Sequence, residues 1–227
     1  FRPSTGEAPF ELHESFFSRT NERGIIQAAN YVFKRVAGFD WEEMQGSPHK
    51  VIRHPDMPKG VFWLLWDTIK RGRNIGVYVK NRSKDGLYYW VYSMVVPCEG
   101  GYISIRFKPS SAILATIQTE YAALLNAEQT ENLTPEESAM RLLARLKELG
   151  FDKYHHFAAN AAAEELLARD VGLNQKQDPT ISNMRTMLNN AETLKQESEG
   201  LVHEFEAMRT IPHNLRVIAS RIEPAGG

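Results

Sequence analysis

The sequence predicts an α+β fold: a five-stranded antiparallel sheet with helices on one face, followed by an all-α region that includes a coiled coil. Three observations predict it. The first half holds all four tryptophans and several β-branched and aromatic runs separated by turns that contain glycine. The second half, after Pro109, has no tryptophan and is rich in alanine, leucine, glutamate and glutamine. Within that half, hydrophobic residues repeat every seven positions.

A hairpin is predicted where the sheet begins. Residues 16–20 and 25–28 are β-type runs, and the polar segment Asn21–Gly24 between them ends in glycine, as hairpin turns often do. Residues 30–44 then predict short helices that are interrupted at Gly38.

A longer helix and three strands complete the predicted sheet domain. The helix covers residues 58–71, because its apolar residues recur at helical spacing and Gly72 follows it. Asp85-Gly86 and Gly100-Gly101 favour tight turns between the strands. The three strands are expected over residues 75–81, 87–97 and 102–108.

Helices are predicted throughout the second half. Thr134-Pro135-Glu136-Glu137 is a capping box with proline in the first helical position. Four helices are expected, over residues 111–126, 134–149, 151–169 and 180–208.

The last helix carries the seven-residue repeat, which predicts a coiled coil and a homodimer. Its two series of seam residues are Met187, Leu194, Leu201 and Met208, and Met184, Ala191, Ser198 and Phe205. The first series continues to Leu215 and Ile222, across Pro212, which is expected to bend or interrupt the helix. A helix packed within its own chain would show the same pattern.

The sequence thus predicts three parts: an N-terminal extension over residues 1–11, a sensor domain over 12–109, and a helical signalling and dimerisation region over 110–227. The chain begins with Phe1, so we expect it to be a piece of a longer protein.

Composition excludes several classes of function. With 27 Lys and Arg against 28 Asp and Glu, the net charge of −1 argues against a nucleic-acid-binding protein. No apolar run approaches the length of a membrane span, so no membrane segment is expected. The single cysteine, Cys98, forbids an internal disulfide and fits the cytoplasm. No phosphate-binding glycine loop, nucleophile motif or metal-ligand spacing is present, so an enzyme is not expected.

Two segments carry a family resemblance. Residues 49–66 read HKVIRHPDMPKGVFWLLW, and residues 80–91 read KNRSKDGLYYWV. Together they resemble the PAS domain of bacterial aerotaxis receptors, which sense oxygen or redox state, and the similarity extends over about residues 12–127. Residues 214–223 loosely resemble the beginning of a chemoreceptor signalling hairpin.

The resemblance implies a PAS fold that holds FAD in its pocket and relays to a downstream chemotaxis or signalling protein. Arg53 could bind a phosphate or a ring carbonyl, and His54 and Asp56 could form hydrogen bonds to the ring or relay a proton. The family's flavin-associated positions fall on Asn30, Arg53, His54, Asp56, Phe62, Trp66 and Asn81.

Alternatives remain open at this point. Ile75 occupies the position where flavin-binding members of the family usually carry tryptophan, which leaves room for a cofactor-free interaction module. Haem ligated by His49 or His54 is a further alternative. His54-Pro55-Asp56 could also be a structural turn that caps the next helix.

Overall fold

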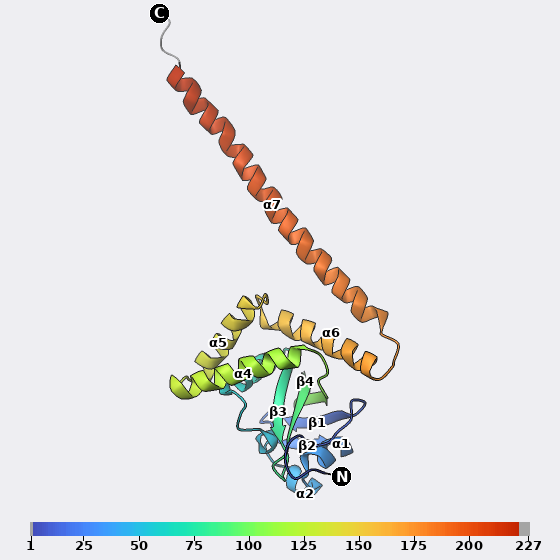
Figure 1. Cartoon of the computed structure of the whole chain (residues 1–227). Coiled ribbons are helices and arrows are strands. Elements are labelled where there is room, and N and C mark those ends of the chain that lie inside the picture. The colour runs from blue at the N-terminus through green and yellow to red at the C-terminus, as the bar shows by residue number, and fades with distance from the viewer. Residues whose placement is uncertain (1, 223–227) are drawn as a thin grey trace, which may run out of the picture. The chain divides into compact units, whose positions relative to one another are not determined.

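The computed structural model describes residues 2–222, with backbone alone at residue 192 and over 207–222. The chain forms two compact units, Phe1–Gln177 and Asp178–Gly227, and each is described by itself (Figure 1). No helix within residues 2–222 has both the length and the apolar character needed to cross a membrane.

The sheet of the first unit has the order β2-β1-β5-β4-β3, and all its neighbouring strands are antiparallel. The predicted five-stranded sheet is confirmed, including the hairpin at Asn21–Gly24, where the Gly24 amide donates to the Asn21 carbonyl. The strands are β1 (Ser15–Asn21), β2 (Ile26–Ala29), β3 (Ile75–Arg82), β4 (Tyr88–Cys98) and β5 (Gly101–Phe107).

Short helical segments connect β2 to β3. Asn30 caps the first of them by accepting a hydrogen bond from the Phe33 amide, and Gly38 ends it in the left-handed conformation that glycine adopts readily. The segments are α1 (Tyr31–Ala37), α2 (Trp41–Met44), the 3₁₀ helix η1 (His49–Ile52) and α3 (Lys59–Lys70). Their arrangement agrees with the predicted break at Gly38 and the predicted helix over 58–71.

Three further helices belong to the same unit: α4 (Ile113–Thr130), α5 (Pro135–Glu148) and α6 (Tyr154–Gly172). The capping box predicted at Thr134 is present at the beginning of α5. Helix α5 packs against α3, where Glu128 of α4 accepts hydrogen bonds from the Gly60 amide and the Ser138 hydroxyl.

Helices α4 and α6 cover the outer face of β3 and β4 (Figure 1). Three tyrosine hydroxyls that connect the layers donate to backbone carbonyls. The pairs are Tyr121 to Tyr78 at 3.2 Å, Tyr92 to Ala158 at 2.7 Å, and Tyr154 to Gly76 at 2.9 Å.

The predicted helices on one face of the sheet are therefore only part of the arrangement. Helices from the second half of the sequence cover part of the other face, because the outward residues of β3 and β4 are large and apolar enough to require a partner layer. The compact unit runs to Gln177, beyond the domain boundary predicted at residues 109 and 110.

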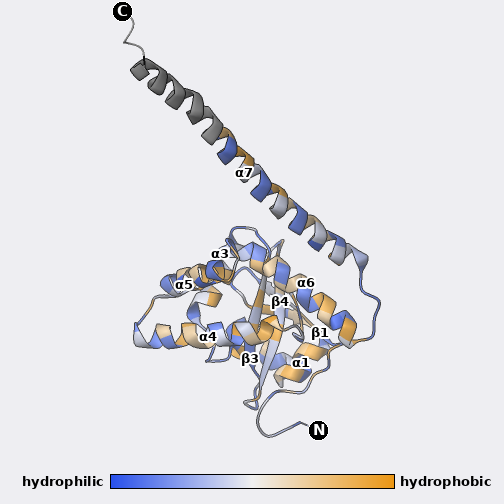
Figure 2. Cartoon of the chain, turned by 45° about the horizontal axis from the view of Figure 1, so that its top comes forward, coloured by the Kyte–Doolittle hydropathy of each residue, from blue (hydrophilic) through white to orange (hydrophobic). Residues whose placement is uncertain are grey.

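The second unit consists of α7 (Pro179–Ile222). Hydrophilic residues predominate along its first part, with hydrophobic residues interspersed (Figure 2). Five of the predicted seam residues are exposed by 54–70%: Met184, Met187, Leu194, Leu201 and Phe205. The helix continues past Pro212, so the interruption expected there is absent; a proline removes a single N–H donor, and the hydrogen bonds on either side of it can continue.

Candidate ligand-binding cavity

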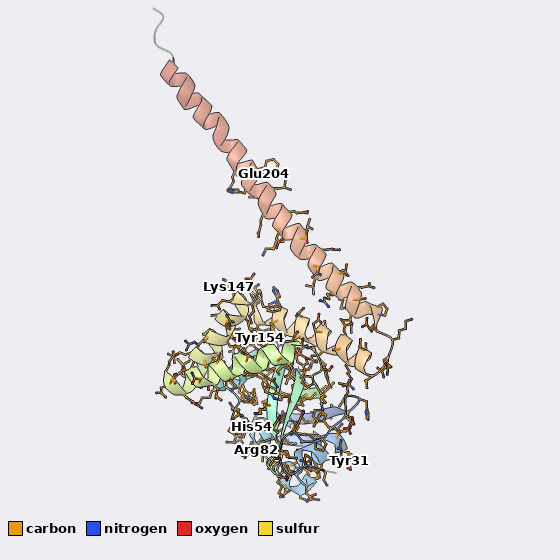
Figure 3. The ribbon with its side chains drawn as sticks, viewed as in Figure 1. Tyr31, His54, Arg82, Lys147, Tyr154 and Glu204 are labelled. Carbon is orange, nitrogen blue, oxygen red and sulfur yellow. The ribbon has the colours of Figure 1, made fainter. Side chains whose placement is uncertain are left out.

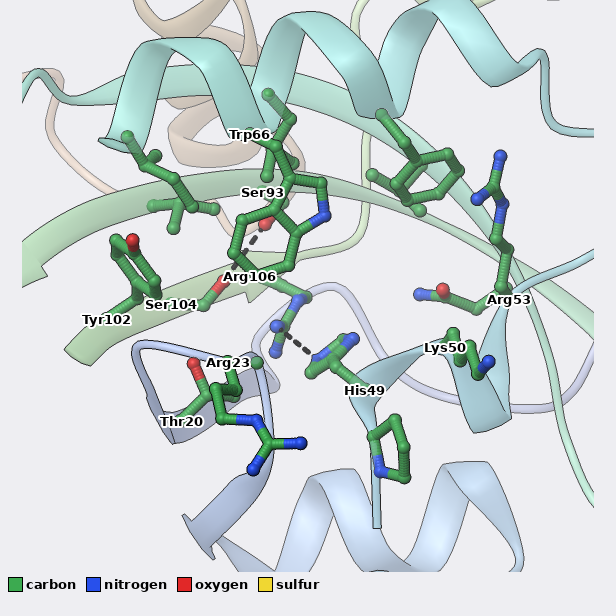
Figure 4. A pocket seen from close by; sticks show the side chains of 18 residues that line it. Thr20, Arg23, His49, Lys50, Arg53, Trp66, Ser93, Tyr102, Ser104 and Arg106 are labelled. Carbon is green, nitrogen blue, oxygen red and sulfur yellow. Dashed lines mark hydrogen bonds between the residues drawn. The ribbon is translucent and has the colours of Figure 1, made fainter. Parts of the chain in front are cut away.

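A cavity of about 260 Å³ lies between α3 and the inner face of the sheet (Figure 4). One wall is apolar, because the hydrophobic residues of α3 face the sheet at helical spacing. These are Phe62, Leu65, Trp66 and Ile69. The cavity therefore offers an apolar surface suited to one face of a ring system.

The opposite wall is polar, because β5 turns its polar side chains toward the interior and its apolar side chains toward solvent. Ser104 and Arg106 face the interior and are each only 5% exposed, whereas Ile105 between them is 44% exposed. Ser93 of the neighbouring strand β4 forms a buried hydroxyl pair with Ser104, with 3.0 Å between the two Oγ atoms. Buried polar side chains on a sheet usually require polar partners, and here the cavity lies directly against them.

Arg106 points into this cavity and forms hydrogen bonds with neutral groups. Its two terminal nitrogens donate to the Ser18 hydroxyl, each at 3.1 Å, and Nη2 also donates to Nε2 of His49 at 2.7 Å (Figure 4). No carboxylate among the described residues lies within 4.0 Å of this guanidinium. Burial lowers the pKa of Arg106 to about 10, so the side chain keeps its positive charge at neutral pH.

His49 is held neutral on the cavity wall. Its ring stacks on Phe33, with 5.8 Å between the ring centroids. Burial, assisted by the charge of Arg106, lowers the pKa of His49 to about 3. Because Nε2 accepts the Arg106 hydrogen bond, the ring proton is on Nδ1.

Arg53 and Asn81 form another edge of the cavity. A backbone bridge joins the two residues, and the Arg53 guanidinium lies 3.6 Å above the centroid of the Phe62 ring. The side chain of Asn81 is 2% exposed, and its Nδ2 donor has no hydrogen-bond partner within the described part of the chain. An unpaired buried amide donor at a cavity is a ready contact for a ligand oxygen.

The β1–β2 turn closes one side of the cavity beneath Trp66. Gly24 has a φ of +75°, and a Cβ at this position would lie 2.8 Å from the Trp66 ring. Arg23 and Lys50 line the cavity and are themselves exposed, which places them at its mouth. The lining residues include the cations Arg23, Lys50, Arg53 and Arg106 and no aspartate or glutamate.

Four of the seven predicted site residues line this cavity: Arg53, Phe62, Trp66 and Asn81. Asn30 lies elsewhere: besides capping α1, its side chain accepts from the Phe17 amide and donates to the Ser15 carbonyl. Its contacts are with the backbone of β1 and α1, which makes it a structural residue in this arrangement.

His54 and Asp56 also lie outside the cavity lining and form a turn. The Asp56 amide donates to Nδ1 of His54 at 3.1 Å, and the Asp56 carboxylate pairs with Lys80 at 2.6 Å. That hydrogen bond from Lys80 lowers the pKa of Asp56, and burial lowers the pKa of His54. Figure 3 places His54 near Arg82, at the end of the unit away from Lys147. This turn brings the neighbouring Arg53 to the cavity.

Ile75, which replaces the tryptophan expected from the resemblance, is 4% exposed and packs with Leu64 and Ile69. It does not line the cavity. Of the two possible haem ligands, His49 has its Nε2 engaged by Arg106, and His54 is outside the cavity with its Nδ1 engaged by the Asp56 amide.

Sequence reasoning missed the polar floor of the cavity. Tyr102, Ser104 and Arg106 alternate with Ile103 and Ile105, which predicts one polar and one apolar strand face. The pattern alone favours the polar face as the solvent face. The exposed isoleucine and buried arginine show that the polar face points inward.

Comparisons with known proteins agree with this architecture. A family model described as the PAS fold matches residues 27–103. The aerotaxis receptor of Escherichia coli (strain K12) is 41% identical over 127 residues, 54% of this chain. The match spans 25% of that receptor's length.

Solved structures with similar folds include the PAS domain of a protein from Colwellia psychrerythraea, with 21% identity and a TM-score of 0.36 over 41% of this chain and 85% of that one. They also include the light-state LOV domain of the blue-light photoreceptor Aureochrome1, with 21% identity and a TM-score of 0.38 over 50% of this chain and 89% of that one.

The matched family and the receptor agree with the resemblance carried by residues 49–66 and 80–91, and the sheet confirms the predicted strands. Residues 27–103 of this chain form a PAS domain, and the N-terminal half of the chain is similar in sequence to the aerotaxis receptor.

Proposed function

We propose that this chain is the input and relay part of a cytoplasmic aerotaxis-type sensor whose PAS cavity holds a flavin, FAD. The observation that carries the proposal is the meeting of Arg53, Phe62, Trp66 and Asn81 around one cavity. When bound, a flavin supplies a redox couple that can follow oxygen or respiratory state. The proposal is for a sensor without catalytic turnover.

The residues present fit such a group. The unpaired Nδ2 of Asn81 supplies a donor, and the α3 wall supplies an apolar face. The volume of about 260 Å³ is slightly below the range of about 300–1,000 Å³ typical of small-molecule sites, so the enclosed space suits a ring system rather than a whole dinucleotide. The exposed lining cations Arg23 and Lys50 would then be available to the phosphates.

Each cavity residue has a separate task in this proposal. Asn81 donates a hydrogen bond to a ring oxygen, and Phe62 and Trp66 exclude water from the ring face. Arg53 stacks on Phe62, so its donors are held in place for a carbonyl or phosphate oxygen. His54 and Asp56 act by holding the turn that positions Arg53.

A relay leads from the sheet to the helices. The Glu165 carboxylate of α6 is fully buried, and it accepts hydrogen bonds from the amides of Ser110 and Ser111, which follow β5. It also accepts from the Tyr78 hydroxyl of β3 at 2.7 Å. We propose that a change in the strands around the ligand is transmitted to α6 through these hydrogen bonds. We propose that α7 passes it to a downstream chemotaxis or signalling protein within a homodimer.

The test is reconstitution of the purified chain with FAD, followed by absorbance and flavin fluorescence. We expect stoichiometric binding with a loss of flavin fluorescence as the ring stacks on Trp66. Trp66→Ala is expected to weaken binding about tenfold or more, since it removes an aromatic contact of the ring.

Asn30→Ala is the matched comparison for the cavity variants. It removes a polar residue that the family resemblance implicates but that lies outside the cavity. It is expected to lower the free energy of unfolding while leaving the FAD dissociation constant of the folded protein within about threefold of wild type. If FAD fails to bind the wild-type chain, even after refolding with excess cofactor, the flavin proposal is wrong.

A further inference from the structure

We infer that the buried end of the PAS cavity is a subsite for negative charge, formed by Arg106 with the hydroxyl of Ser104 and flanked by His49. The inference rests on the proposed function only in treating this cavity as a ligand site, and it does not require the ligand to be a flavin. The ligand class that it specifies is a flat organic molecule with a carboxylate, or a ring-delocalised negative charge, at its buried end.

The positive charge of Arg106 has no carboxylate partner among the described residues. A buried guanidinium normally has a carboxylate partner, because removing an ion from water is costly unless another charge compensates. In the same unit, the half-buried Arg35 pairs with Glu14 at 2.5 Å, and Arg145 pairs with Glu120 at 2.9 Å. Arg106 is more deeply buried than either, and within the described part of the chain its hydrogen bonds reach only Ser18 and His49, while its guanidinium lies 5.4 Å from the centroid of the Phe33 ring.

His49 does not compensate the charge of Arg106. The ring is neutral at physiological pH, since burial and the neighbouring guanidinium both disfavour its protonation. It accepts one hydrogen bond from Nη2 and thereby fixes the orientation of the guanidinium.

The cavity lining supplies no anion for Arg106 either. The residues lining the cavity carry four cationic side chains and no carboxylate. The Ser93–Ser104 hydroxyl pair lies on the same floor and can offer a further hydrogen bond to an anion (Figure 4). The protein partners of Arg106, which are Ser18, His49 and the Phe33 ring, are all neutral, so its positive charge is available to a ligand.

The experiment compares two probes of the same shape, benzoate and benzamide, with the full chain freed of any cofactor. Both are small enough for a cavity of about 260 Å³, and they differ in the charge of one end. We expect calorimetric titration to show benzoate binding at least about tenfold more tightly than benzamide, the effect of one charge-assisted interaction.

Variants identify the charge that produces this preference. In Arg106→Gln the preference is expected to fall to about twofold or less, and in Arg106→Lys to remain at several-fold, because the positive charge is kept. Arg19→Gln is the control: Arg19 is exposed on β1 and donates to the Glu99 carbonyl, so its removal changes net charge equally but outside the cavity. Circular dichroism checks that each variant is folded. We expect Arg106→Gln to fold, because the substitution removes a charge that has no carboxylate partner.

The inference would be overturned if benzoate did not bind, or if benzoate and benzamide bound equally well. It would also be overturned if Arg19→Gln lost the preference for benzoate as fully as Arg106→Gln. A titration with FAD then tests the anion subsite and the proposed flavin function separately. Displacement of benzoate by FAD supports both. A benzoate preference that depends on Arg106 in a chain that does not bind FAD supports the anion subsite and rejects the flavin. FAD binding without any benzoate preference supports the flavin and rejects the subsite.

Discussion

Asn81 shows at the scale of one residue how the cavity is prepared for a ligand. Its amide nitrogen is buried on the inner side of β3 without a partner in the described chain. A buried donor left unpaired costs about 1–3 kcal/mol of folding free energy. The folded protein carries this cost until a ligand accepts the hydrogen bond, so the residue contributes more to binding than to stability.

Replacement of Asn81 by leucine separates these two contributions. We expect Asn81→Leu to leave the free energy of unfolding of the ligand-free chain unchanged, or to raise it by about 1 kcal/mol, because the unpaired donor is gone. The affinity for FAD is expected to fall about tenfold or more. Urea denaturation and fluorescence titration measure the two quantities. A large loss of stability with unaltered FAD affinity would contradict this interpretation.

His49 makes the free energy of unfolding depend on pH, and the sign of this dependence follows from the lowered pKa of His49, about 3. The unfolded chain takes up a proton near pH 6.5, whereas the folded chain does not, so stability is complete above about pH 6.5 and falls as the pH decreases toward 3. Between pH 7 and pH 5 this residue alone is expected to lower the free energy of unfolding by up to about 2 kcal/mol.

Urea denaturation at pH 7, 6 and 5 measures this dependence against His49→Gln. Glutamine does not titrate, and its amide oxygen keeps an acceptor for Arg106. We expect the wild-type chain to lose more stability than the variant over this range. Parallel pH profiles of the two proteins would mean that His49 titrates normally in the folded state.

Individual residues also show where sequence reasoning succeeds and where it stops. Arg53, Phe62, Trp66 and Asn81 were predicted because they occupy segments that carry the family resemblance, and the cavity brings them together. Arg106 was not predicted, because strand alternation gives two faces without telling which one is buried.

At the scale of elements, the junction between the sheet and α6 depends on one carboxylate. Glu165 is 0% exposed and accepts four hydrogen bonds, from the Tyr78 hydroxyl, the Ser110 amide, and the amide and hydroxyl of Ser111. These donors belong to β3 and to the segment between β5 and α4. One side chain therefore joins three parts of the fold that are distant in sequence.

Glu165→Ala is expected to leave these donors unpaired and to lower the free energy of unfolding by about 3 kcal/mol or more. Hydrogen exchange is expected to speed up along α6 more than in the central strands. Glu136→Ala, at an exposed position in the first turn of α5, is the control and should change stability by less than about 1 kcal/mol. Equal effects of both substitutions would show that Glu165 does not tie α6 to the sheet.

Most elements could be predicted from local sequence. The capping box at Thr134 and the glycine stop at Gly38 define helix ends through backbone hydrogen bonds that lie within a few residues. The covering of β3 and β4 by α4 and α6 could not be predicted, because an apolar helix stripe does not specify the surface that it covers. That choice depends on contacts such as Tyr121 with Tyr78.

At the scale of the whole molecule, α7 presents an apolar stripe that its own unit does not cover. Met187, Leu194 and Leu201 are each more than half exposed, and their seven-residue spacing is that of a two-helix seam. Exposed apolar side chains in such a regular series favour association with an identical helix.

Leu194→Lys places a charge in that seam and is expected to convert a dimer of the chain to monomer at micromolar concentration. Gln196→Lys adds the same charge two positions away, outside both seam series, and is expected to leave the dimer intact. Sedimentation equilibrium distinguishes the two results. A wild-type chain that sediments as a monomer would mean that the stripe has another partner.

The two compact units also show what composition could reveal at this scale. The change in residue content near Pro109 correctly separates β-rich from helical sequence. It does not coincide with the end of the first compact unit at Gln177, because α4, α5 and α6 are held to the sheet domain by contacts between residues far apart in the chain.

The tyrosine contacts between sheet and helices have a consequence for how homologous chains can diverge. Tyr92, Tyr121 and Tyr154 each donate to a main-chain carbonyl, which every amino acid provides. Drift at the accepting position Ala158 can therefore keep the hydrogen bond from Tyr92, whereas loss of the Tyr92 hydroxyl cannot be compensated by its partner. Among homologous chains, Tyr92 should accordingly change more slowly than Ala158, whereas Tyr78 and Gly76 are constrained by contacts of their own with Glu165 and Tyr92.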